Sequence, residues 1–316
     1  FWWQGYLPFP FLGGDAALQA SYVAASRYPE AFVNDPVLYA ARNYSFYRII
    51  HLDLLLFLEP LFGDFGTSYL ALLAPGTFIQ LFGFYLLGRY LFENKLYAFL
   101  LAVVSIGKLD LVIDYWGTYP DFEPRILYQV FLPFVLSAII NFGPKPSAWP
   151  WLLAWQGLLV WVHPPSAPPF ALATLFGLFC YKPASWSIGR CVVWAIFSGF
   201  IFLAVCSPYI LSFSDDRPHE KVENYNEIIA IYRSFLGRYY LDVVQHILLF
   251  TEGKSFRYFL IPWSILGAVC AYKYAGEHKQ RDVNFMIVTL LSLAVIAPGV
   301  ALADQIYSEM TQNLPL

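Results

Sequence analysis

Residues 67–92 read TSYLALLAPGTFIQLFGFYLLGRYLF, and this stretch decides the fold. It is longer than the ~20 apolar residues that a helix needs to cross a bilayer, and its only charged residue, Arg89, lies near its end. Similar stretches recur along the chain, so we predict an all-α, polytopic integral membrane protein. The predicted spans are 67–92, 96–113, 126–142, 149–162, 166–181, 188–212, 256–273 and 283–302.

The composition supports lipid as the solvent. Of the 316 residues, 59% are hydrophobic, 20% are aromatic and only 13% are charged, whereas soluble domains have about a quarter of charged residues. The net charge is −3 and no basic stripe exists, which excludes nucleic acid as an expected partner. The expected partner is membrane lipid.

Basic side chains gather in every second turn between the predicted spans. Only three acids, Glu93, Glu277 and Asp282, share these turns. The positive-inside rule places such turns in the cytoplasm, so the alternate gaps are predicted to be external. The basic residues are Arg89, Lys95, Lys145, Lys182, Arg190, Lys273, Lys279 and Arg281.

The chain contains no linker or repeat, and we interpret residues 1–316 as one transmembrane domain. Residues 1–66 are predicted to form a first external loop with interfacial helices, at 16–28, where Pro29 stops the helix, and at 37–58. Core spans over 67–213, an external loop at 214–255 with a helix at 225–250, and further spans over 256–302 complete the prediction. We expect both ends of the chain to be truncated.

Asp15 follows two glycines in Gly13-Gly14-Asp15 at the start of the first predicted helix. One interpretation is an N-cap, in which the carboxylate accepts free N–H groups of the helix start. The other is a general base at the membrane surface, where the glycines let a substrate approach the backbone. The residues themselves leave both open.

An acidic external loop ends in Asp121-Phe122-Glu123-Pro124-Arg125, directly before a predicted span. One interpretation is a solvated turn in which Arg125 reaches the lipid headgroups. The other is a phosphate site, because a guanidinium binds two phosphate oxygens at once. Asp121 and Glu123 would then be supporting acids that orient Arg125.

The run His163-Pro164-Pro165-Ser166-Ala167-Pro168-Pro169 separates two predicted spans. A lone histidine in such a turn is most often structural, and prolines are expected at a helix start. A helix that starts near Ser166 nevertheless points its positive N-terminal end outward, beside His163, and helix N-termini bind phosphate. Arg125 is predicted to lie at the same membrane level.

Nothing in the sequence indicates a metal or another cofactor, although a divalent metal is compatible with it. The four cysteines form no CxxC pair and are predicted to be buried free thiols. His51 and Asp53 are spaced by two, which does not place them on one helix face. We therefore predict no metal site.

The chain resembles the polytopic GT-C glycosyltransferases, membrane enzymes that use polyprenyl-phosphate sugars, and it is most similar to bacterial members. The resemblance rests on Gly13-Gly14-Asp15, the external stretch of 16–58, Glu123-Pro124-Arg125 and His163-Pro164-Pro165, and it covers the chain to about residue 213. It implies a GT-C-like helical bundle with external amphipathic helices in the bacterial plasma membrane, with the motif loops on the extracytoplasmic side.

The resemblance also implies chemistry. An acid of the first external loop is the catalytic base of that superfamily, and Asp15 matches it by position. Ala16 stands where many members have a second acid, for which Asp35 is a possible spatial substitute. An inverting transfer from a polyprenyl-phosphate sugar is implied, with Arg125, His163 and Ser166 on the phosphate.

Two other functions remain as alternatives. The single acid in the first loop motif and the aromatic content favour a non-catalytic structural or assembly subunit that binds other membrane subunits. A transporter would have polar groups at mid-bilayer and repeat symmetry. Gln80 and Gln156 are the main polar residues inside predicted spans and no repeat is present, so a transporter ranks last.

Overall fold

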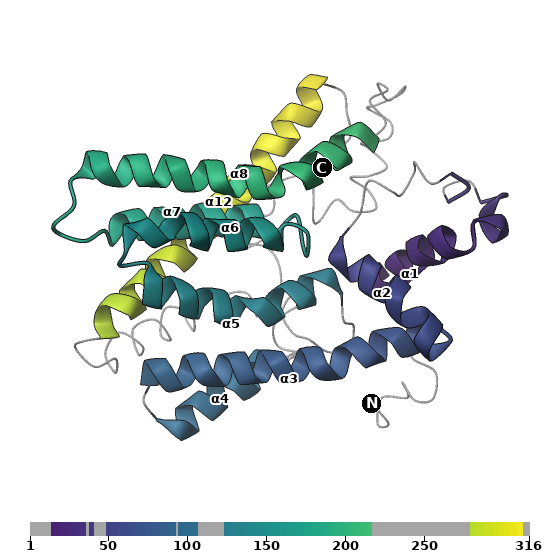
Figure 1. The fold of residues 1–316 in the computed structure, drawn as a ribbon, viewed down its shortest axis with the longest axis horizontal. Helices are drawn as coiled ribbons and strands as arrows, with labels where there is room; N and C mark the ends of the chain where they lie inside the picture. The colour runs from purple at the N-terminus through teal and green to yellow at the C-terminus, as the bar shows by residue number, and fades with distance from the viewer. Residues whose placement is uncertain are drawn as a thin grey trace, which may run out of the picture. The chain divides into compact units, whose positions relative to one another are not determined.

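A computed structural model describes residues 14–35, 38–40, 49–92, 94–106, 123–216 and 279–311. These residues form helices joined by turns, and none of them lies in a strand (Figure 1). The all-helical prediction is therefore confirmed. The elements are α1 (Gly14–Arg27), η2 (Pro29–Phe32), α2 (Ile50–Phe62), α3 (Phe65–Phe92), α4 (Lys95–Ile106), α5 (Pro124–Phe142), η4 (Pro146–Ala148), α6 (Trp149–Leu159), α7 (Ala167–Cys180), α8 (Ile188–Asp216) and α12 (Gln280–Thr311).

The chain divides into two compact units. The larger unit comprises Phe1–Ala171 with Leu178–Arg217, and the smaller comprises Leu172–Gly177 with Pro218–Leu316. In the larger unit, α3 packs against α2, α4 and α5, and α6 packs against α5 and α8. In the smaller unit, Phe285 and Thr289 of α12 lie against Gly177 of α7. The prediction of one domain stays a prediction.

Among the residues that the structure describes, three helices are long and apolar enough to cross a membrane. They are Phe65–Phe92, Pro124–Phe142 and the Ile188–Ser212 part of α8, and they agree with the predicted spans 67–92, 126–142 and 188–212. The helices α4, α6 and α7 have 12, 11 and 14 residues, fewer than the ~20 of a straight crossing. These findings indicate an integral membrane protein.

The sequence of α3 separates a packing face from a lipid face. Its buried residues Tyr69, Leu73, Gln80 and Leu87 recur at helical spacing, while large apolar side chains such as Phe78 stay exposed. Gln80 is 1% exposed, and its Nε2 donates to the Ser105 carbonyl of α4 at 2.9 Å. The Gln80 amide therefore lies against protein, and the apolar face of α3 points outward. This is the arrangement that a helix in lipid requires.

A close approach joins α3 to α4. A Cβ built on Gly88 would lie 2.7 Å from the Cα of Ala98, so only glycine fits there without moving a backbone. Small residues at such contacts let membrane helices pack closely. Ala98 and Ala102 of α4 are both buried at this side of the helix.

One carboxylate links α1 to α2 in the N-terminal region. Glu59 of α2 is buried; it accepts a hydrogen bond from Tyr28 Oη at 2.8 Å and pairs with Arg27 Nε at 3.7 Å. The helix predicted at 16–28 is confirmed by α1, and Pro29 follows its end. The helix predicted at 37–58 is wrong at its start, because residues 38 and 39 form a turn and α2 begins at Ile50.

Several predicted segments lie outside the described residues. These are the span 256–273, the helix at 225–250, residues 107–113 of the second predicted span, and the loop segment that contains Asp121. The predicted span 283–302 falls within α12. The interfacial position of α1 and α2 stays a prediction.

Candidate functional site

The start of α5 places a carboxylate and a guanidinium beside each other. Glu123 is the residue before the helix and has an extended backbone, and Pro124 occupies the first helical position, where its missing N–H costs nothing. Arg125 Nη2 donates to Glu123 Oε2 at 2.9 Å. The Glu123 side chain is 11% exposed and that of Arg125 is 31% exposed, so the ion pair is partly shielded from water.

The turn between α6 and α7 is closed by a side-chain contact. His163 Nδ1 lies 2.7 Å from Ser166 Oγ. The backbone N–H groups of Ser166 and Ala167 donate to the His163 carbonyl at 3.2 and 3.3 Å. The helix predicted to start near Ser166 begins at Ala167, and its N-terminal end is therefore next to His163.

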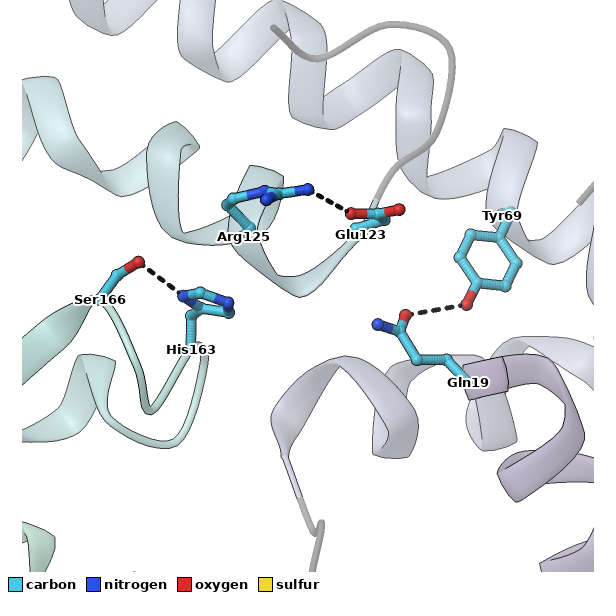
Figure 2. A network of polar contacts seen from close by, with 6 residues as sticks. All are labelled: Gln19, Tyr69, Glu123, Arg125, His163 and Ser166. Atoms are coloured by element: carbon cyan, nitrogen blue, oxygen red, sulfur yellow. Dashed lines mark hydrogen bonds and ion pairs between the residues drawn. The ribbon is translucent and has the colours of Figure 1, made fainter. Parts of the chain in front are cut away.

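His163 is uncharged at neutral pH. Burial, together with the positive charge of Arg125, lowers its pKa to about 4. The guanidinium therefore lies within electrostatic range of the imidazole. Figure 2 shows the Arg125 side chain directed toward Glu123, with the turn that carries His163 and Ser166 beside the start of α5. A neutral imidazole at this point is a hydrogen-bond donor and acceptor rather than a cation.

Tyr128 joins these two parts, and sequence reasoning missed it. Its ring centroid is 6.3 Å from that of His163 and 6.5 Å from that of Phe170. The Tyr128 hydroxyl is buried and has no hydrogen-bond partner among the described residues. The spacing of three from Arg125 was the available signal, because residues i and i+3 share a helix face.

The N-terminal helices reach the same region. The Ile50 N–H at the start of α2 donates to the Trp161 carbonyl, in the turn before His163, at 2.8 Å. His51 is fully buried and its ring lies 5.4 Å from that of Tyr69 on α3. The Tyr69 hydroxyl in turn donates to Gln19 Oε1 of α1 at 3.1 Å, as Figure 2 shows. The starts of α2 and α5 and the α6–α7 turn therefore lie near one another.

Of the predicted acids, the described contacts bring Glu123 to the candidate site. The backbone of Asp15 lies in the first turn of α1, but its side chain is outside the described residues, as is all of Asp121. Asp35 Oδ1 accepts the Leu38 N–H at 2.7 Å, which is a local turn contact. Among the predicted supporting acids, Glu123 is the one seen on Arg125.

The described residues contain no group of three or more His, Cys, Asp or Glu side chains able to hold a metal. His51 is buried and Asp53, two residues later on α2, is exposed, so these two do not form a pair of ligands. The side chains that converge here, Arg125, His163, Ser166 and Tyr128, donate hydrogen bonds and suit an anion. Comparison with protein families, curated proteins and solved structures finds no match for this chain.

Proposed function

We propose that the chain is a membrane glycosyltransferase-like protein that moves a sugar from a polyprenyl-phosphate donor to an acceptor at the extracytoplasmic face. The observation that carries this proposal is the approach of Arg125 on α5 to His163 in the α6–α7 turn. The start of α5 and the α6–α7 turn are adjacent, since the rings of Tyr128 and His163 are 6.3 Å apart, and both Arg125 and His163 are of kinds that can bind phosphate oxygens. The GT-C-like bundle, the bacterial plasma membrane and the side of the membrane are parts of the same proposal.

In this mechanism the phosphate of the donor lies between the guanidinium and the start of α7. Arg125 supplies the charge. The Ser166 hydroxyl donates to His163 Nδ1, so the neutral ring presents its N–H at Nε2 to a phosphate oxygen. The α7 N-terminus adds a partial positive charge. A neutral His163 costs less to bury than an imidazolium ion, which explains why it serves as a donor.

The transfer step follows from this placement. An acceptor hydroxyl attacks the anomeric carbon of the sugar, and its proton passes to the Asp15 carboxylate. The bond from that carbon to the phosphate oxygen breaks, and the lipid phosphate leaves with the electron pair. Arg125 and His163 stabilise the charge that develops on that oxygen, which favours the transition state over the ground state. Attack opposite the leaving group inverts the sugar centre.

Binding of the lipid phosphate tests the site without knowledge of the sugar. The full chain in detergent micelles is titrated with undecaprenyl phosphate, and undecaprenol serves as the uncharged control. We expect Arg125→Gln to weaken binding of the phosphate by at least about tenfold, since a hydrogen bond to a charged group contributes ~1.5–3 kcal/mol. Arg89→Gln, an equal charge loss at the end of α3, is the matched control. Equal binding by Arg125→Gln and the unaltered chain would disprove the phosphate site.

Asp15→Asn tests the base separately. In an assay of sugar release from radiolabelled polyprenyl-phosphate sugars, we expect this variant to bind the donor normally and to lose transfer. Transfer at the original rate would exclude Asp15 as the base and would leave the phosphate site untouched.

A second candidate function is a non-catalytic subunit of a larger membrane complex. The observation that favours it is the Glu123–Arg125 ion pair at 2.9 Å, because a guanidinium already neutralised by a carboxylate stabilises structure without any ligand. Other membrane subunits would then cover part of the exposed apolar surface. The two functions differ in what removal of the Glu123 charge does to binding of lipid phosphate.

A further inference from the structure

A group of cations lies on the α5–α6 and α7–α8 turns. These turns are at the end of the larger unit opposite to His163. These turns are at the left of Figure 1. Lys145 precedes η4, and η4 contacts α8. The α5–α6 turn lies against the last turn of α7, since a Cβ built on Gly143 would lie 2.6 Å from Leu178 Cδ2. Trp149 Nε1 donates to the Gly143 carbonyl at 2.8 Å, which links the two ends of the α5–α6 turn.

Trp186 organises the cations of the α7–α8 turn. The Arg190 guanidinium carbon lies 4.1 Å from the centroid of a Trp186 ring, a cation–π distance. Lys182 Nζ donates to the Trp186 carbonyl at 2.9 Å. Both cations are thus held on one residue. A stacked guanidinium directs its N–H edge away from the ring, and an ammonium has two further N–H groups.

Within the part of the chain that the structure describes, these positive charges have no acid paired with them. The sequence contains no Asp or Glu between Glu123 and Asp215. Among the described residues, Lys145, Lys182 and Arg190 form no ion pair. Lys145 and Arg190 are exposed. This turn region therefore has a net positive surface that an external anion would neutralise.

The surface next to the cations is apolar and open. The membrane-crossing window of α8 is only 17% buried. One turn after Arg190 begins a face of large exposed side chains that includes Val193, Phe197 and Phe200, of which Val193 is 66% exposed. Cations at the end of a lipid-facing helix, followed by an apolar strip, match the headgroup and acyl chains of one phospholipid.

We propose that Lys145, Lys182, Trp186 and Arg190 form a binding site for the headgroup of an anionic phospholipid, whose acyl chains lie along the exposed face of α8. This site is independent of the donor site at Arg125. It takes a lipid with a net negative headgroup, and it does not take a zwitterionic one or free phosphate.

The test measures lipid retention by native mass spectrometry of the full chain, purified from micelles that contain equal amounts of phosphatidylglycerol and phosphatidylcholine. The unaltered chain should retain phosphatidylglycerol in preference. Lys182→Gln/Arg190→Gln should lower this preference by about fivefold for each cation removed. The matched control, Arg89→Gln/Lys95→Gln, removes two cations from the α3–α4 turn and should keep it. Thermal unfolding of each variant checks that it is folded.

Four outcomes would overturn the proposal. One is an unchanged preference in Lys182→Gln/Arg190→Gln, and another is an equal fall in the control pair, which would show a general surface charge. Displacement of the lipid by inorganic phosphate would assign the site to the free anion. Trp186→Leu keeps every charge and should still lower the preference; full retention in this variant would show that no built site exists.

Discussion

The positive charge of Arg125 on α5 helps to keep the imidazole of His163, in the α6–α7 turn, neutral. Burial of the ring has the same effect. The two residues are separated by 37 positions of sequence, from 126 to 162. The neutral ring is what allows His163 to remain in a partly buried turn against Ser166. The relationship makes the protonation of His163 a sensitive measure of whether this region is assembled.

The first prediction concerns pH. The pKa of His163 is about 4 in the folded chain and ordinarily 6.5, so between these values the unfolded chain binds more protons. The contribution of His163 to the free energy of unfolding is therefore fully present above pH 6.5. It is lost as the pH is lowered toward 4, and the loss is on the order of 3 kcal/mol. Unfolding in sodium dodecyl sulfate at several pH values measures this. His163→Gln should flatten the dependence, and an unchanged slope in that variant would contradict the assignment.

The second prediction concerns Glu123. Glu123→Gln removes the charge that pairs with Arg125, so the guanidinium becomes available to phosphate. We expect undecaprenyl phosphate to bind more tightly, by about tenfold or more, while the variant unfolds more easily. Glu59→Gln, which alters the carboxylate that pairs with Arg27, is the matched control and should leave binding unchanged. Loss of stability without tighter binding would favour the non-catalytic subunit.

The third prediction concerns the hydroxyl of Tyr128. Because it is buried without a partner among the described residues, Tyr128→Phe should leave the free energy of unfolding unchanged or raise it by up to about 1 kcal/mol. Tyr69→Phe removes a hydroxyl that donates to Gln19 and should lower it by ~1 kcal/mol. Both substitutions remove one hydroxyl group from a tyrosine ring, so the two changes in the free energy of unfolding can be compared directly. A stability loss in Tyr128→Phe equal to that in Tyr69→Phe would disprove this assignment.

The fourth prediction concerns the contact between α3 and α4. Gly88→Ala introduces a Cβ 2.7 Å from Ala98 Cα, so we expect a loss of ~1–3 kcal/mol from overpacking. At Gly199 of α8 a built Cβ meets nothing within 4 Å, and Gly199→Ala should be neutral or stabilising by at most ~1 kcal/mol. Unfolding in sodium dodecyl sulfate measures both. Equal stability of the two variants would show that α3 and α4 do not pack this closely.

The most accurate predictions from the sequence are those that depend on local signals, namely long apolar stretches and prolines at helix ends. Residues 67–92, 126–142 and 188–212 contain long apolar stretches with few charges, and each falls in a single helix. Pro29 and the proline run at 164–169 likewise mark the end of α1 and the start of α7. Such signals depend on neighbouring residues and need no knowledge of tertiary contacts.

Tertiary contacts account for what was missed. Tyr128 appears as one apolar-face residue of a span, and only the packing of α5 against the α6–α7 turn brings it to His163. The error at 37–58 has a similar origin, because Ile50 starts α2 where its N–H donates to Trp161, a partner more than a hundred positions away. Glu123 was expected to orient Arg125, but the proposal that it competes with a ligand follows only from the 2.9 Å contact between the two side chains.

Because of Gln156, we expect the integration of α6 into the membrane during synthesis to depend on neighbouring helices. The amide is 1% exposed, and neither of its polar atoms has a hydrogen-bond partner among the described residues. A helix of 11 residues is about 16 Å long, roughly half the hydrocarbon thickness. We expect newly synthesised α6 to be released from the translocation machinery together with α8 rather than singly, which ties the order of membrane integration to the order of translation.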